Sequence, residues 1–342
     1  MQVAMYYGSN DIRIEDLPAP EAGKGEILIR IMASGICGSD VMHWYRAGKT
    51  PLVLGHEIAG EVVAVGEGVN ACKVGDRVSA SHHVPCNTCH YCLKDHHTVC
   101  DTLRKTKFDP GGFAEYVRLP SINVDRGLYL LPEELSFEEA TFIEPLACVY
   151  RGQRIAKTEL GVSMLVIGSG ISGLLHIQLA RALGASLIVA ADITPYRLEA
   201  AKRFGADEVI DARGDLPELF RTMNKNRLAD IVVLTTGAEN AVDQAFRSVD
   251  RGGTILFFAP SRADTKTPMP LNDLFWRNEI TLTSSYAANY KEHITAMEFI
   301  RQKRVNVSDM ITHSLPLSEI QKGFTLVEEA RESLKVIIKL HE

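Results

Sequence analysis

The sequence predicts an α/β fold of two domains, one rich in short β-strands and one built as a doubly wound parallel sheet. The chain has 342 residues, which is more than one ordinary hydrophobic core holds. Residues 1–150 contain short apolar runs separated by glycine-containing turns, a pattern typical of a β-rich domain. Residues 151–287 alternate strand-like and helix-like segments, which indicates a parallel sheet covered by helices. Residues 288–342 break this alternation, so we expect them to complete the first domain.

The composition narrows the possible partners. The net charge is −6, with 46% hydrophobic and 23% charged residues, and no basic stripe is present to bind nucleic acid. No apolar run approaches the roughly 20 residues that span a bilayer. The N-terminus, MQVAMYYGSNDIRIED, lacks the pattern of a secretion signal. We therefore expect a cytoplasmic protein that binds neither nucleic acid nor membrane.

The predicted β-rich domain has strands at residues 26–32, 57–65, 76–80 and 114–119. Between the first two lies a candidate metal site formed by Cys37, His56 and Glu57. These are zinc ligand types, and three protein ligands leave an open position for water or substrate. The alternative is a buried cysteine beside a chance His–Glu pair.

A second candidate metal site is a loop with four of the seven cysteines, Cys86, Cys89, Cys92 and Cys100. Four thiolates can close a tetrahedron around zinc and leave no position for water, which is typical of a structural site. The alternatives are free buried cysteines, or ligation by the neighbouring histidines His82, His83, His90, His96 and His97. Because four thiolates are available, we expect the histidines to be loop residues.

The segment 137–151 is predicted to be one helix, with Ser136 as its N-cap and acidic residues in its first turn. Glu144 precedes Pro145 within the apolar face of this helix. A buried carboxylate needs a partner, and a cation is one candidate. The alternative is a glutamate at the protein surface.

The second domain is predicted to have strands at residues 164–168, 186–191, 208–210, 230–235, 253–258 and 279–285. Helices are expected at 171–183 and at 195–204, where Thr194 is the N-cap and Pro195 takes the first helical position. In the last part of the chain we expect a helix at 290–302, a capping box at 318–321 and a strand at 335–340.

The first strand of the second domain runs into a glycine-rich turn and a helix, Gly168, Ser169, Gly170, Ile171, Ser172 and Gly173. In this G-x-G-x-x-G pattern the glycines allow a tight turn, approach of a pyrophosphate, and close packing of helix on strand. The pyrophosphate then meets the N-terminus of the helix. The alternative is a strand–helix turn without a ligand.

Asp192 follows the next strand, about 20 residues beyond this turn, where an acidic residue binds the ribose hydroxyls of NAD. Asp192 therefore favours NAD over NADP, although Arg197 leaves NADP open as an alternative. Thr236 and Gly237 follow the fourth strand, and we expect them to flank the nicotinamide unless they are ordinary loop residues.

Taken together, these residues resemble the zinc-dependent medium-chain dehydrogenase/reductase family. The resemblance covers essentially the whole chain and is greatest to the polyol branch, represented by sorbitol dehydrogenase, with threonine dehydrogenase nearby. The resemblance rests on the motifs GICGSD (35–40), GHE (55–57), the four-cysteine loop, GGFAEY (111–116), IEPL (143–146), GSGISG (168–173) and Asp192. The resemblance implies a GroES-like catalytic domain interrupted by a Rossmann domain. It also implies two zinc ions per chain, NAD, and a homodimer or homotetramer.

The resemblance also implies roles for individual residues. Cys37, His56 and Glu57 resemble the residues at the catalytic zinc, and Glu144 resembles either a fourth ligand or the group that holds the zinc-bound water. Many family members have a relay histidine five residues after the first zinc cysteine. Here Met42 takes that position and His43 follows it. The family's glutamate in IEPL favours a hydroxyl-rich substrate.

The resulting hypothesis is oxidation of a secondary alcohol, with reduction of the ketone as the reverse reaction. Ser39 is expected to take the hydroxyl proton, which His43 or the cofactor ribose then passes on. Two alternatives stay open: an L-threonine or amino-alcohol dehydrogenase, and a zinc- and nucleotide-binding protein without turnover.

Overall fold

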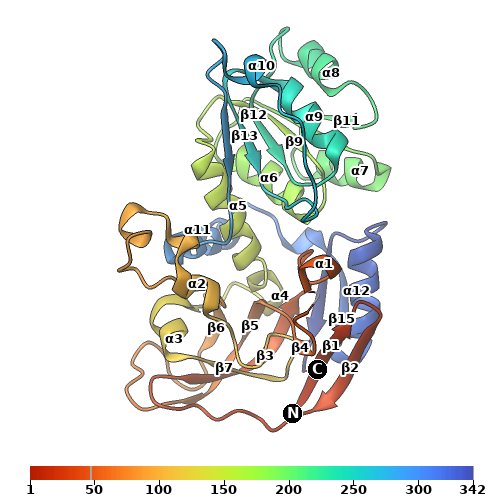
Figure 1. Cartoon of the computed structure of the whole chain (residues 1–342). Coiled ribbons are helices and arrows are strands. Elements are labelled where there is room, and N and C mark those ends of the chain that lie inside the picture. The colour runs from red at the N-terminus through yellow and green to blue at the C-terminus, as the bar shows by residue number, and fades with distance from the viewer. Residues whose placement is uncertain (47, 342) are drawn as a thin grey trace. The chain divides into compact units, whose positions relative to one another are not determined.

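The computed structural model describes residues 1–46 and 48–341. The chain divides into two compact units (Figure 1). The first unit comprises Met1–Ala147, Ala287–Lys303 and Val307–Glu342, and the second comprises Cys148–Tyr286 and Arg304–Asn306.

The first unit is built on two sheets, with the order β2-β1-β4 in one and β15-β16-β3-β5-β6-β8 in the other, where β7 also pairs with β3. The strands are β1 (Gln2–Gly8), β2 (Asp11–Asp16), β3 (Ile27–Gly35), β4 (Leu52–Val53), β5 (Glu57–Val65), β6 (Arg77–Ala80), β7 (Tyr116–Leu119), β8 (Leu128–Leu130), β15 (Ile311–Pro316) and β16 (Lys335–Lys339). The C-terminal strand β16 pairs directly with β3, so the end of the chain completes the sheet begun at its start.

The strand β3 shows why this sheet forms where it does. Its residues Ile27, Ile29 and Ile31 are buried, and they alternate with less buried positions, as expected for a strand with one face on a core. Its antiparallel partner is β5, and the register places Gly35 opposite Glu57. The segments that supply Cys37 and His56 therefore adjoin neighbouring strands, after the end of β3 and before the start of β5.

The helices of the first unit are α1 (His43–Arg46), α2 (Asp101–Lys105), α3 (Ser121–Gly127), α4 (Phe137–Ala140), α11 (Tyr290–Arg301) and α12 (Ile320–Glu329), and α5 (Ile143–Ile155) begins in it. The single helix predicted at 137–151 is wrong, because α4 and α5 are separate. Pro145 explains the break, since a proline lacks the N–H that a helix interior requires and fits a first turn. Ser136 does cap α4, as predicted, in a capping box with Glu139.

The capping box predicted at 318–321 is wrong. A short 3-10 helix (Leu317–Glu319) occupies this position, and α12 begins after Glu319 without a side-chain cap. A capping box is present instead at α11, where Asn289 and Glu292 bond each other's backbone N–H groups.

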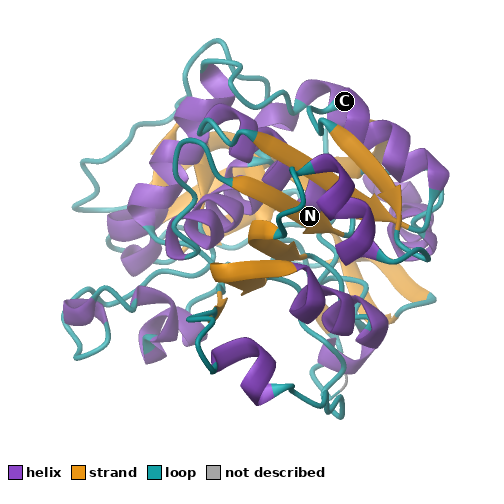
Figure 2. Cartoon of the chain, turned by 90° about the horizontal axis from the view of Figure 1, so that it is seen from above, coloured by secondary structure: helices purple, strands orange, loops and turns teal. Residues whose placement is uncertain are grey.

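The second unit contains a six-stranded parallel sheet with the order β11-β10-β9-β12-β13-β14 in the described part of the chain. Its strands are β9 (Ser163–Ile167), β10 (Leu187–Asp192), β11 (Glu208–Asp211), β12 (Ala229–Leu234), β13 (Val249–Phe257) and β14 (Thr281–Ser284). Its helices include α6 (Ile171–Ala182), α7 (Pro195–Arg203), α8 (Leu216–Met223), α9 (Glu239–Ser248) and α10 (Leu271–Phe275). Figure 2 shows helices (purple) next to the strands (orange).

This strand order confirms the predicted doubly wound α/β fold. The chain moves outward from β9 through α6 and α7, and then returns to the other side of β9 through α8 and α9. Right-handed crossovers in opposite directions place the two helix pairs on opposite faces, and α6 contacts α7 whereas α8 contacts α9. The order reverses between β9 and β12, where sheets of this kind bind ligands at the carboxyl ends of their strands. No helix of the described residues is long and apolar enough to cross a membrane.

Candidate metal sites and dinucleotide site

The structure brings Cys37, His56 and Glu57 together. Cys37 follows β3, while His56 and Glu57 stand at the start of β5, so the pairing of the two strands sets their spacing. One potential ligand atom from each residue lies within 4.8 Å of the others. A thiolate, an imidazole and a carboxylate form a donor set that suits zinc. These residues therefore fit a metal ion, as proposed for them from the sequence.

Asp40 supports this site and was missed by the sequence analysis, although it belongs to the GICGSD motif. Its side chain is fully buried, and Oδ2 accepts a hydrogen bond of 3.1 Å from the backbone N–H of Cys37. Its Oδ1 lies 3.6 Å from Nδ1 of His56 and 3.0 Å from Nη2 of Arg46. A carboxylate beside the second ring nitrogen orients a metal-binding histidine.

The electrostatics of the site favour a cation. Burial of the His56 ring opposes protonation, but the Asp40 and Glu144 carboxylates and the Cys37 thiol together raise the pKa of His56 well above its usual value. Burial also raises the pKa of Asp40, and the neighbouring His56 and Arg46 oppose that rise. Groups that stabilise a protonated imidazole so strongly would also stabilise a metal cation.

Glu57 forms an ion pair with Lys335, and each side chain is only 1% exposed. The Lys335 Nζ also donates to the carbonyl of Ile36 over 3.4 Å, and it lies 5.5 Å from the Phe142 ring centroid. A Cβ atom at Gly35 would stand 2.3 Å from Glu57 Oε2 and 2.7 Å from Lys335 Nζ, so a larger residue there would displace this pair. Sequence reasoning missed Lys335; the available signal was a lysine within the apolar strand LKVIIKL.

Glu144 lies in the first turn of α5 and is partly buried. Its charge acts on the pKa values of both His56 and Tyr129, so it lies within electrostatic range of the candidate metal site. It is not one of the three donors that meet within 4.8 Å. Its role as a fourth ligand stays a prediction.

Ser39 and His43 have different surroundings. The Ser39 carbonyl and hydroxyl accept hydrogen bonds from Arg46 over 3.2 and 3.4 Å, which fixes Ser39 beside Cys37. His43 lies in α1, and its Nε2 forms a half-exposed pair of 2.8 Å with Glu328. The structure therefore holds Ser39 close to the metal donors and engages His43 with a carboxylate.

Several other histidines lie near these donors. The His82 ring is 4.8 Å from the His56 ring and 3.8 Å from the His83 ring, measured between centroids. Burial and the neighbouring His83 and His56 lower the pKa of His82 well below its usual value. His293 Nε2 lies 2.8 Å from the Ser81 hydroxyl, and burial lowers the pKa of His293 to about 4.

The four cysteines of the loop also come together. One sulfur from each of Cys86, Cys89, Cys92 and Cys100 lies within 4.8 Å of the others. The Cys89–Cys92 and Cys86–Cys100 sulfur pairs are each 3.6 Å apart. This is close to the edge of about 3.8 Å expected for a tetrahedron with Zn–S bonds of about 2.3 Å. The loop therefore fits a closed structural zinc site. Of the nearby histidines, His97 instead pairs with Asp95.

The glycine-rich turn has the geometry that dinucleotide binding requires. Gly168 follows β9 with φ +98°, a backbone conformation that residues other than glycine rarely adopt. A Cβ atom at Gly173 would lie 2.0 Å from the Gly168 carbonyl, so helix and strand pack closely. At Gly170 the nearest atom to such a Cβ is 3.9 Å away, on the Arg197 guanidinium. The turn thus leaves open space at its second glycine, where a pyrophosphate needs it.

Residues around the turn have unpaired polar atoms that a cofactor could bind. Asp192 ends β10 and accepts the backbone N–H groups of Ser169 and Thr194 over 2.7 and 2.9 Å. These bonds hold the carboxylate beside the turn. The buried Ser169 Oγ and Arg197 Nε have no hydrogen-bond partner within residues 1–46 and 48–341. The residues present therefore fit a dinucleotide. Ile171 and Ser172, the first residues of α6, lie at the helix N-terminus.

Thr236 and Gly237 follow β12, and they lie at the carboxyl ends of the parallel strands, as Gly168 does. The Thr236 hydroxyl accepts the backbone N–H of Ala238 over 3.4 Å, and a Cβ atom at Gly237 would stand 2.6 Å from the Pro260 carbonyl. The structure thus places both residues at the predicted binding edge. Their contact with nicotinamide stays a prediction.

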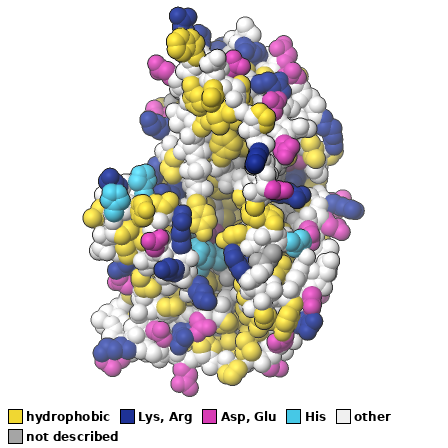
Figure 3. Space-filling view, viewed as in Figure 1, with side chains coloured by type: hydrophobic (Ala, Val, Ile, Leu, Met, Phe, Trp, Pro, Cys, Tyr) yellow, Lys and Arg dark blue, Asp and Glu magenta, His cyan; other side chains and the backbone are white. Residues whose placement is uncertain are grey.

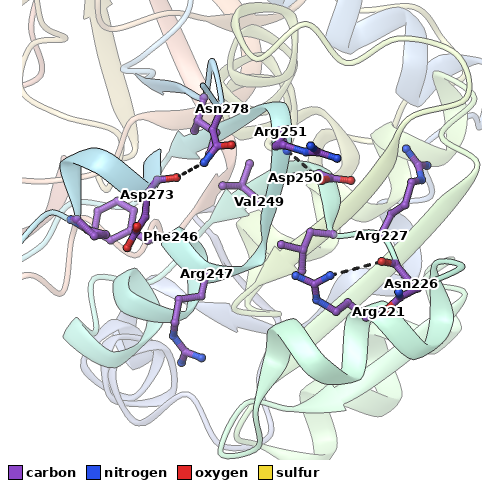
Figure 4. Close-up of a pocket in the computed structure, with 13 residues that line it drawn as sticks. Arg221, Asn226, Arg227, Phe246, Arg247, Val249, Asp250, Arg251, Asp273 and Asn278 are labelled. Atoms are coloured by element: carbon purple, nitrogen blue, oxygen red, sulfur yellow. Dashed lines mark hydrogen bonds between the residues drawn. The ribbon is translucent and has the colours of Figure 1, made fainter. Parts of the chain in front are cut away.

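The second unit also has a pocket of about 560 Å³ at the amino ends of the parallel strands, near the start of β12 and β13 (Figure 4). The dinucleotide site lies at the carboxyl ends of the same strands. Four arginines line it: Arg221, Arg227, Arg247 and Arg251. Arg221 and Arg247 lie in the last turns of α8 and α9, where positive charge stabilises the helix dipole. This pocket is therefore separate from the dinucleotide site.

Comparisons with known proteins agree with this geometry. Residues 23–127 match the alcohol dehydrogenase GroES-like domain, and residues 172–302 match the zinc-binding dehydrogenase family. The sorbitol dehydrogenase of Bacillus subtilis (strain 168) is 34% identical, with 99% of this chain and 97% of the relative covered. The probable D-xylulose reductase A of Aspergillus clavatus is 31% identical, with coverage of 97% and 94%.

Similarity of sequence at this level over nearly the whole chain decides the family. The chain belongs to the zinc-dependent medium-chain dehydrogenase/reductase family. Within it, the chain falls in the sorbitol dehydrogenase-like branch. A solved structure, the alcohol dehydrogenase TADH from Thermus sp. ATN1, is 30% identical, covers all of both chains and superposes with a TM-score of 0.87. The predicted family, fold class and oxidoreductase class are confirmed.

Proposed function

We propose that this dehydrogenase oxidises a secondary hydroxyl group of a polyol to a ketone with NAD⁺, and that it catalyses the reverse reduction. The observation that carries the proposal is that one chain holds both a three-donor metal site and an open glycine-rich turn beside an acidic residue. In the balanced reaction the alcohol loses a hydride and a proton, and NAD⁺ gains the hydride. The relatives named for sorbitol and D-xylulose support a polyol substrate.

The residues that would hold the catalytic zinc are Cys37, His56 and either Glu57 or Glu144. When bound, zinc supplies a Lewis acid that favours loss of the hydroxyl proton, and NAD⁺ supplies the hydride acceptor. The Asp40 carboxylate lies beside Nδ1 of His56 and favours an orientation in which the other ring nitrogen faces the metal.

Ser39 is the residue that takes the substrate's hydroxyl proton in this proposal. An arginine only donates hydrogen bonds, so one lone pair of the Ser39 hydroxyl oxygen accepts a bond from Arg46. The other lone pair is available to accept the substrate's proton, and the hydroxyl's own proton is available to pass onward. His43 and the cofactor ribose are the two candidates for the next step, and the pairing of His43 with Glu328 supplies it with a carboxylate partner.

NAD is favoured over NADP because Asp192 stands at the end of β10. A carboxylate in this position binds ribose hydroxyls and repels the additional phosphate of NADP. Its two bonds to backbone N–H groups hold it in place at the turn.

We further propose that the enzyme is a homodimer or homotetramer. Met269, Leu271, Phe275 and Trp276 are exposed within eight residues of the second unit. Figure 3 shows hydrophobic side chains gathered on the part of this unit that carries α10. The strand β14, at the edge of the six-stranded sheet, follows this segment and has one paired neighbour among the described strands. Exposed apolar groups beside an open strand edge favour association.

The test is a substrate screen followed by NADH absorbance, with sugar alcohols, inositols, L-threonine, amino alcohols and simple secondary alcohols. We expect turnover of a polyol with NAD⁺ and about two zinc ions per chain. Cys37→Ser should abolish turnover and remove one zinc, while NADH binding persists. Full activity of this variant, or preference for L-threonine in the screen, would contradict the proposal.

A further inference from the structure

His82 lies next to the candidate metal site but has no role in the proposed mechanism. It follows β6 after one intervening residue, and its ring lies 4.8 Å from the ring of the metal donor His56. Its Nδ1 is enclosed and has no hydrogen-bond partner within the part of the chain that the structure describes. An enclosed polar nitrogen without a partner is unfavourable, and a ligand that bonds it would remove this cost.

The neighbouring ring shows that this is not a general property of the loop. His83 lies 3.8 Å from His82, and its Nδ1 bonds the carbonyl of Thr106 over 2.8 Å. The two histidines share a local environment, yet only the one next to the metal donor lacks a partner for Nδ1. His82 as a residue is partly exposed, whereas Nδ1 is enclosed, so a small molecule bonds Nδ1 only after a local shift that uncovers it.

The chemistry of the ring limits the kind of ligand. An imidazole nitrogen donates or accepts a hydrogen bond, depending on where the ring carries its protons. A hydroxyl group can take either role, so it matches Nδ1 of His82 in both cases.

We propose that His82 determines specificity by hydrogen-bonding, through Nδ1, a second hydroxyl group of the substrate next to the reacting one. The inference rests on the proposed function, because the reacting oxygen is taken to bind at the metal held by His56. It deepens that function by naming the substrate class: a vicinal diol within a polyol. A site built around such a bond rejects an analogue that lacks the hydroxyl, because the buried nitrogen is then left unpaired.

The test compares butane-2,3-diol with butan-2-ol, which share a carbon skeleton and differ by one hydroxyl group. We expect His82→Leu to lower the ratio of kcat/KM for the diol to that for the monoalcohol by about ten- to hundredfold. His82→Asn places an amide close to the position of Nδ1, so the ratio should stay near that of the wild type. The matched control is His83→Leu, which removes a neighbouring ring of the same size and should leave the ratio unchanged.

Two readouts other than turnover separate this role from a structural one. Zinc content and NADH binding by fluorescence should be the same in His82→Leu as in the wild type. Loss of zinc would show that His82 is a metal ligand and would overturn the inference. An equal loss of activity toward both alcohols, or no change in either, would overturn it as well.

The outcomes also distinguish this inference from the proposed function. If the wild type oxidises butan-2-ol as efficiently as the diol, the specificity role fails while the dehydrogenase function stands. If the wild type oxidises no alcohol in the presence of zinc and NAD⁺, both fail together.

Discussion

Replacing Lys335 by methionine should destabilise the first unit strongly. The Lys335–Glu57 pair is buried, with each side chain 1% exposed, so the variant leaves a carboxylate in the interior without its cation. Removing one partner of a buried ion pair costs about 3–5 kcal/mol. Methionine fills most of the same space, so the lost charge rather than a cavity accounts for this effect.

Zinc should reduce this loss, because Glu57 also belongs to the group of three potential metal ligands. A bound cation offers the carboxylate a second opposite charge. We therefore expect Lys335→Met to lower the free energy of unfolding more in the presence of a chelator than in excess zinc. Each comparison between variant and wild type is made at the same metal concentration, because chelation also affects the four-cysteine loop.

The assay is urea unfolding followed by circular dichroism. The control is Lys322→Met, since Lys322 forms a pair of 2.7 Å with Glu319 at the surface, with side chains 61% and 44% exposed. Loss of an exposed pair should cost about 0–1 kcal/mol. The double variant Glu57→Gln/Lys335→Met should be more stable than Lys335→Met alone. Equal losses for the two lysines, or no recovery in the double variant, would refute the reasoning.

Three further predictions concern other sites. Asp192→Asn should weaken binding of NADH relative to NADPH by about tenfold, measured by fluorescence titration, and an unchanged preference would contradict its role. Cys100→Ser should remove one of two zinc ions per chain by elemental analysis and lower stability, whereas retention of both would exclude a four-cysteine site. Burial lowers the pKa of His176 to about 3 from 6.5, so its neutral form contributes stability that is fully present above pH 6.5 and lost as the pH falls toward 3. The difference in free energy of unfolding between the wild type and His176→Leu, measured in urea, should decrease by about 2 kcal/mol between pH 7.5 and pH 5. A difference that stays constant with pH would contradict this prediction.

The parts of the fold and site that the sequence predicted depend on local patterns. The strand–turn–helix at Gly168–Gly173 and the spacing of Cys86–Cys100 lie within short segments, so their chemistry is visible along the chain. The pairing of Gly35 with Glu57 joins two segments that are distant in the sequence, so local patterns could not predict it. Each of these segments contains residues of a type that binds metal. The sequence could therefore nominate Cys37 and His56 but could not show that they meet.

The supporting residues could not be predicted because their partners are distant or belong to the backbone. Lys335 reaches Glu57 only because β16 pairs with β3, a contact between the two ends of the chain. The apolar neighbours of Lys335 in LKVIIKL suggest that it is buried, but they do not show which carboxylate it meets. Asp40 is close to Cys37 in sequence, but its role depends on His56, which only the fold brings to it.

The charges around Cys37 give an independent reason to expect a divalent cation. Four acidic groups act on this site when the thiol is ionised: Cys37, Asp40, Glu57 and Glu144. Arg46 pairs with Asp40, and Lys335 pairs with Glu57. The Cys37 thiol lies beside these groups in a largely buried region, where ionisation of a thiol is unfavourable without a nearby positive charge. A zinc ion would supply that charge to an ionised Cys37, and an imidazole such as that of His56 adds a ligand without adding negative charge.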